Sequence, residues 1–120
     1  MGMKVNTKYG QVDVSNRVIS IIVGNAVTDV FGVAGLAPRH PLRENLMILL
    51  NKNNYQQGVH IKQVKGEVEV QVSIIVGFGM KISEIGKNVQ DRIKYNLELM
   101  LSVSPSIVNV IVQDVKLIDD

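Results

Sequence analysis

The stretch from Ser15 to Ala37 constrains the fold most, because it places an apolar helix between two strand-like segments. Before it, residues 10–14 alternate polar and apolar side chains, which indicates a half-buried strand, and Ser15 stands where a helix N-cap belongs. Residues 16–30 carry a broad apolar face, which is typical of a deeply buried helix. Residues 31–37 are mostly small and apolar and predict a buried strand. The stretch is a strand-helix-strand unit with almost no reactive side chain.

The middle of the chain predicts a short helix followed by a hairpin. Pro38 and Pro41 separate the buried strand from a helix predicted over residues 42–50. A strand then begins at Gly58, and Lys65-Gly66 is a turn into the clearest strand of the chain, where apolar residues recur at every second position up to Phe78.

Two irregularities in the strand pattern predict bulges. Val64 is out of phase with Val59 and Ile61, which indicates a bulge near Gln63. The last strand begins at Ile107, and its phase slips near Gln113-Asp114. Between the hairpin and this strand, an apolar stripe at helical spacing predicts a helix over residues 81–101.

The order of these elements predicts an α/β (α+β) fold. It reads β-α-β-(short α)-β-β-α-β, which we interpret as a two-layer sandwich of a mixed sheet with its helices on one face. We expect a single domain over residues 10–120. Residues 1–9 are expected to be a flexible N-terminal segment, in which Met1-Gly2 reads as an expression scar.

One face of this sheet is expected to be open, and it is the candidate interaction surface. If Val72 and Ile74 face the helices, their neighbours on the same strand point the opposite way, and the last strand has outward residues of its own. The predicted surface consists of Ser73, Ile75, Asn109 and Ile111. Two exposed isoleucines indicate self-association or a protein partner.

Composition excludes several classes of protein. The 120 residues are 46% hydrophobic, which is enough for one core, and the absence of cysteine excludes thiol chemistry and favours an intracellular address. No apolar run approaches the ~20 residues that span a bilayer, so we expect a cytoplasmic protein. The net charge of +2 comes with dispersed Lys and Arg and only 4% aromatic residues, so nucleic-acid binding is not expected.

No pattern of reactive residues predicts an enzyme, a metal site or a cofactor site. His40 and His60 are far apart in sequence and are expected to be exposed histidines. Glu67 and Glu69 share a strand face, which predicts an exposed polar edge. The segment Gly32 to Gly35 matches the G-x-x-G pattern of KH domains, and it carries the alternative hypothesis of a nucleic-acid-binding module with nearby basic residues. A tightly packed strand is the favoured interpretation, since Phe31 and Leu36 look buried.

Three segments resemble the bacterial alkaline shock protein family, in particular its short members without a charged tail. They are Thr7-Lys-Tyr-Gly-Gln-Val-Asp-Val-Ser15, Phe31-Gly-Val-Ala-Gly35, and Gly79-Met-Lys-Ile-Ser-Glu-Ile followed by Asn88-Val-Gln. The resemblance covers nearly the whole chain, but it rests on small and apolar positions. It implies a fold family and brings no catalytic residue.

The resemblance implies a non-enzymatic interaction or scaffold protein of Gram-positive bacteria. The family is linked to alkaline or cell-envelope stress, and its short members are often encoded beside a dihydroxyacetone-kinase-like protein of fatty-acid metabolism. Some relatives act at the inner membrane surface through an anchoring partner. The implied location is therefore cytoplasmic, with membrane proximity supplied by a partner.

Overall fold

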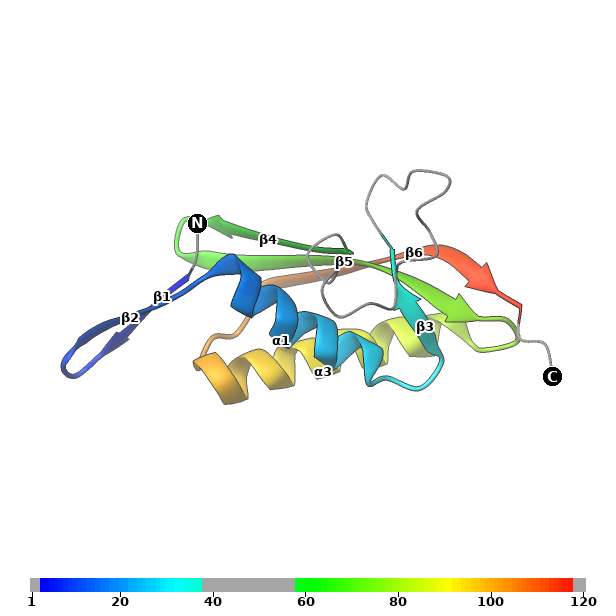
Figure 1. Cartoon of the computed structure of the whole chain (residues 1–120), viewed down its shortest axis with the longest axis horizontal. Coiled ribbons are helices and arrows are strands. Elements are labelled where there is room, and N and C mark those ends of the chain that lie inside the picture. The colour runs from blue at the N-terminus through cyan, green and yellow to red at the C-terminus, as the bar shows by residue number, and fades with distance from the viewer. Residues whose placement is uncertain (1–2, 38–57, 118–120) are drawn as a thin grey trace.

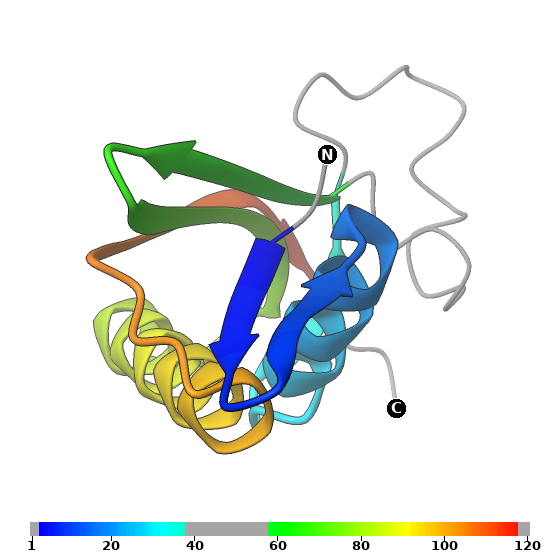
Figure 2. The same ribbon diagram turned by 90° about the vertical axis from the view of Figure 1, so that its left-hand side faces the viewer.

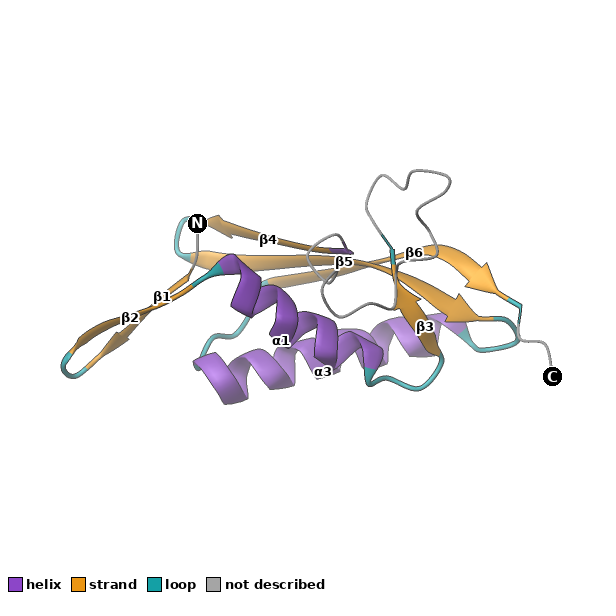
Figure 3. Cartoon of the chain, viewed as in Figure 1, coloured by secondary structure: helices purple, strands orange, loops and turns teal. Residues whose placement is uncertain are grey.

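Two helices pack against one face of a four-stranded sheet in the part of the chain that the structure describes, residues 3–37 and 58–117. In this computed structural model, α1 (Asn16–Thr28) and α3 (Ile82–Leu101) lie side by side on the same side of the sheet (Figures 1 and 2). The sheet consists of β3 (Val33–Leu36), β4 (Val59–Val64), β5 (Glu67–Gly77) and β6 (Ile107–Lys116) (Figure 3). The predicted two-layer sandwich with a mixed sheet is confirmed.

The central strand is β5, which is paired along both edges. β6 runs parallel to it from Glu69 to Gly77 along one edge. Along the other edge, β4 pairs antiparallel with its first half and β3 with its second half. The ends of β3 and β4 meet, since a Cβ on Gly58 would lie 2.9 Å from the Leu36 Cβ and 3.0 Å from the Ala37 carbonyl oxygen.

The structure confirms the predicted turn and one of the two predicted bulges. Lys65 and Gly66 have φ angles of 51° and 81°, as a type I′ hairpin turn requires, so the predicted turn is confirmed. The register of β5 and β6 shifts by one residue at Gln113, which confirms the predicted bulge. The bulge near Gln63 is wrong, because β4 pairs with β5 without interruption and Val64 simply lies on the outer face opposite Glu67.

The core lies between the helices and the inner face of the sheet. Its large side chains that are only 0–1% exposed come from four elements: Ile19, Val23 and Val27 of α1, Leu36 of β3, Val70, Val72, Ile74 and Val76 of β5, and Val89, Ile93 and Leu97 of α3. The alternation in β5 and the helical spacing in α1 and α3 place these residues on facing surfaces. Ser15 caps α1 by accepting a hydrogen bond from the Val18 amide at 3.3 Å, as predicted.

The N-terminal residues form a hairpin of their own. β1 (Met3–Thr7) and β2 (Gly10–Val14) pair antiparallel in a separate two-stranded sheet that projects beyond the helices and the main sheet (Figure 1). Residues 10–14 were expected to belong to the main sheet, and residues 1–9 to be flexible. The alternation in 10–14 predicts a strand correctly, but alternation does not determine which strand becomes its neighbour.

Some expectations concern residues outside the described ranges. The helix predicted over residues 42–50 and His40 are among them. Among the residues that the structure does describe, neither helix is sufficiently long and apolar to span a membrane.

Candidate interaction surface

The outer face of the sheet brings the four predicted surface residues together. Ser73 and Ile75 point away from the helices, because Val72, Ile74 and Val76 between and beside them face the core. The parallel register places Ile111 opposite Ser73, and Asn109 opposite Gln71. The bulge in β6 then brings Asp114 opposite Ile75. The four residues therefore form one patch across β5 and β6.

Their exposures differ along this patch. Ile111 is 36% exposed and Asn109 is exposed, whereas Ile75 is half-buried and Ser73 is 0% exposed. The expectation of two exposed isoleucines therefore holds for Ile111 and is wrong for Ile75. The second exposed isoleucine of the outer face is Ile107, which lies on the same face of β6 as Ile111 and is 42% exposed. Sequence reasoning missed Ile107 because it begins the strand, although its spacing from Asn109 and Ile111 placed it on the same face.

The part of the outer face formed by β4 and the first half of β5 is polar. Lys62 lies opposite Glu69 and His60 opposite Gln71. Together with Asn109 these residues line a shallow pocket of about 200 Å³. His60 was expected to be exposed but is half-buried. Within the described ranges, no group of His, Asp and Glu side chains is arranged to hold a metal ion.

Two polar atoms near this patch are buried without a hydrogen-bond partner. They are the Ser73 hydroxyl oxygen and the Gln71 amide nitrogen. A buried donor without an acceptor costs about 1–3 kcal/mol. Both residues point to the outer side of β5. The outer face was expected to be open, but it is closed to solvent at Ser73 in β5, and its exposed apolar side chains are Ile107 and Ile111 of β6.

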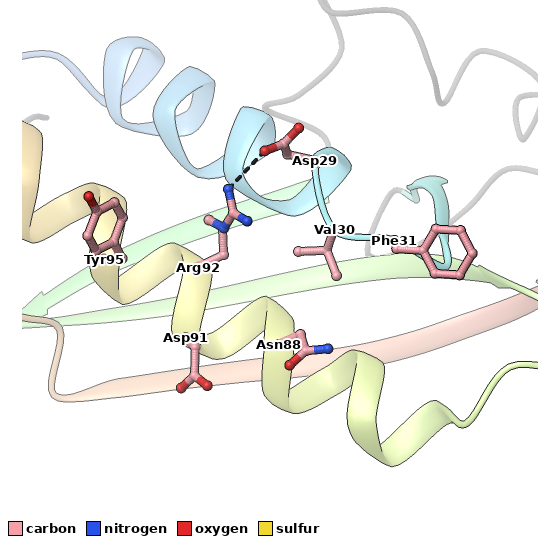
Figure 4. A pocket seen from close by; sticks show the side chains of 7 residues that line it. All are labelled: Asp29, Val30, Phe31, Asn88, Asp91, Arg92 and Tyr95. Atoms are coloured by element: carbon pink, nitrogen blue, oxygen red, sulfur yellow. Dashed lines mark hydrogen bonds and ion pairs between the residues drawn. The ribbon is translucent and has the colours of Figure 1, made fainter.

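A second concave site lies on the helix side and combines residues that are far apart in sequence (Figure 4). The pocket has a volume of about 510 Å³ and is lined by Asp29, Val30, Phe31, Asn88, Asp91, Arg92 and Tyr95. Arg92 Nη1 lies 2.8 Å from Asp29 Oδ2, and this ion pair joins the end of α1 to the middle of α3. Sequence reasoning missed this pocket, because only the packing of the helices brings the two segments together.

The structure distinguishes the two interpretations of the Gly32 to Gly35 segment, a packed strand and a nucleic-acid clamp. Phe31 was expected to be buried and is 85% exposed, whereas Leu36 is 1% exposed, as expected. Gly35 is buried and pairs with Ile75 of β5. A backbone clamp for nucleic acid must be accessible to phosphates, whereas most of this segment is a paired strand. The packed-strand interpretation therefore fits the geometry better.

Comparison with known proteins supports the resemblance found in the sequence. The model of the alkaline shock protein family, described as having a cell envelope-related function, matches residues 4–117. The uncharacterized protein Spy1614 of Streptococcus pyogenes is 40% identical over 120 residues, which are 100% of this chain and 99% of that protein. The uncharacterized protein YloU of Bacillus subtilis is 36% identical and covers 97% of both chains. No solved structure matches. With its match running from the N-terminal hairpin to the end of β6, this chain belongs to the alkaline shock protein family.

Proposed function

We propose that this protein is a non-enzymatic binding protein that serves a cell-envelope function by presenting the outer face of β5 and β6 to a protein partner. The family description supports the cell-envelope part of the proposal. The observation that carries the binding part is the pair of exposed isoleucines, Ile107 and Ile111, on the outer face of β6.

The sequence of β6 is typical of a strand that is covered on both faces, which is why we expect a partner on the outer face. Residues 107–112 read Ile-Val-Asn-Val-Ile-Val, so the strand is apolar on both faces over this stretch except at Asn109. Such near-continuous apolar runs are typical of strands that are covered on both faces. Val108, Val110 and Val112 pack against the core, whereas Ile107 and Ile111 are 42% and 36% exposed.

The partner that fits this face is a protein segment with apolar side chains. Those side chains would cover Ile107 and Ile111, which are exposed on the outer face of β6. The family resemblance suggests two candidates, a kinase-like protein of fatty-acid metabolism and an anchoring protein of the cell envelope. A role in the stress response belongs to the same proposal.

The test is co-purification of the tagged protein from its native cells, followed by mass spectrometry, with three versions of the chain. We expect the wild type to retain a protein partner after nuclease treatment and Ile107→Lys with Ile111→Lys to lose it. Ile82→Lys is the matched control, because Ile82 is 43% exposed but lies at the start of α3. Equal recovery of the partner with all three versions would contradict the proposed surface.

Loss of binding must be separated from loss of folding. The double variant should keep the far-ultraviolet circular dichroism of the wild type, because both substitutions lie at exposed positions. Recovery of nucleic acid alone, and its loss after nuclease, would instead favour the nucleic-acid-binding alternative.

A further inference from the structure

The N-terminal hairpin is amphipathic, and part of its apolar face is exposed. Cross-strand pairing places Val5 opposite Val12 on one face, and Lys4 opposite Asp13 on the other. Val14, on the apolar face near the base of the hairpin, packs against the core. Further out on the same face, Val12 is 51% exposed. The apolar face therefore continues from the core into solvent.

A hairpin of this kind needs a contact to remain ordered. An isolated two-stranded hairpin is at best marginally stable in water. Each strand has five residues, which corresponds to about 17 Å, and the hairpin projects past the body of the protein (Figure 1). At its tip, Tyr9 is 93% exposed and lies next to Lys8. These features are typical of an arm that contacts another molecule.

The same end of the molecule displays a second apolar surface. Because the two helices run antiparallel, the start of α1 and the end of α3 lie at the end from which the hairpin projects (Figure 1). Leu99 and Met100, in the last turn of α3, are 67% and 60% exposed, and Val18 of α1 is 42% exposed. The hairpin of the same chain does not cover them.

The charge at the end of α3 complements the hairpin tip. The last turn of α3 contains Glu98 and no basic residue. The carbonyl end of a helix carries partial negative charge and is stabilised by cations, so Glu98 adds to a charge that nothing in this turn offsets. Lys8, at the tip of the hairpin, carries the opposite charge.

We propose that the occupant is a second copy of the chain, in a two-fold dimer in which each hairpin packs on the α3 end of the other copy. The Val5 and Val12 face of one copy covers Leu99 and Met100 of the other, and Lys8 lies near Glu98 at the end of the partner's helix. In a two-fold dimer, the same contact between a hairpin and the end of α3 forms twice. The dimer uses a surface separate from the outer sheet face.

Cysteine crosslinking tests the geometry directly, because the chain has no cysteine of its own. Two single-cysteine chains of different mass, Lys8→Cys and Glu98→Cys, are mixed and oxidised, and the mixed disulfide is quantified. Lys8→Cys mixed with Lys87→Cys is the control, since Lys87 is exposed but lies near the other end of α3. We expect the first pair to crosslink several-fold more than the control pair. Equal yields would overturn the proposal.

Sedimentation equilibrium of the full chain tests the energetics. We expect the wild type to dimerise and Val12→Asp to raise the dissociation constant about tenfold or more, because it would bury an unpaired carboxylate. Gln11→Asp, on the polar face of the same hairpin, should leave the constant unchanged. A monomeric wild type, or equal effects of the two variants, would refute the arm contact.

The outer-face variant separates this dimer from the proposed function. Ile107→Lys with Ile111→Lys should leave the dimer intact. If that variant abolishes the dimer while Val12→Asp does not, the outer sheet face is the self-association surface and the hairpin contact is wrong.

Discussion

Replacing Gly32 by alanine should destabilise the protein strongly, for two independent reasons. Gly32 has a φ of 98°, which lies in the region that residues with a Cβ rarely adopt. A Cβ at this position would also lie 2.7 Å from Ile85 Cδ1 and 3.1 Å from Ile85 Cγ1. Ile85 is only 5% exposed, so its side chain has little room to move away.

The two contributions give an expected magnitude. The backbone conformation costs about 1–2 kcal/mol for a residue other than glycine. Overpacking of a filled core costs about 1–3 kcal/mol more. Gly32→Ala should therefore lower the free energy of unfolding by about 2–5 kcal/mol.

A double-mutant cycle with Ile85→Val isolates the steric contribution. This substitution removes Cδ1, the atom closest to the added Cβ, and by itself should cost about 0.5–1.5 kcal/mol. In the Gly32→Ala background the same change relieves the overlap, so its cost should disappear. The coupling between the two positions should therefore be about 1 kcal/mol or more.

The assay is urea unfolding of the four proteins, followed by circular dichroism. Additive effects would refute the contact between Gly32 and Ile85. A Gly32→Ala protein as stable as the wild type would refute both reasons and revive the G-x-x-G hypothesis. In that hypothesis the substitution would instead weaken binding to nucleic acid.

Three further stability predictions follow from single features. Ser15→Ala removes the side-chain cap of α1 and should cost about 1 kcal/mol, which thermal unfolding would detect; no change would contradict the capping role. Ile93→Ala opens a cavity at a 0% exposed position and should cost about 2–5 kcal/mol in urea unfolding, and a cost below ~1 kcal/mol would mean that the core is loosely packed. Lys65→Asn should stabilise the type I′ turn by roughly 0.5 kcal/mol, because asparagine tolerates positive φ better, and a lower urea midpoint would argue against this turn type.

Local structure was predictable because it depends on short-range patterns. Alternation identified β5, and an apolar stripe identified α3 to within one residue at its start. Ser15 as a cap and Lys65-Gly66 as a turn follow from the chemistry of those side chains and of glycine. The slip at Gln113 was visible as a phase change within a single strand.

The same reasoning failed where a single residue carried the signal. Val64 is apolar at a position that faces outward, but the backbone of β4 keeps its alternation up to this last residue, so the apolar side chain alone did not signal a bulge. Phe31 was expected to be buried because it is large and apolar. It is 85% exposed, because it lies in the connection between α1 and β3 and not in the strand itself.

Apart from β1, the sequence by itself determined which of the described segments are helices and strands and which of their faces enter the core, because both depend on periodicity within a segment. Only the tertiary structure decided the partners of each element. It set β1 and β2 apart as a projecting hairpin, placed β6 parallel to β5, and brought residues 29–31 beside α3. Strand pairing and helix packing join residues that are distant along the chain, and alternation is satisfied equally by several neighbours. The candidate surfaces consist of such distant residues, and this is why they emerge only from the folded chain.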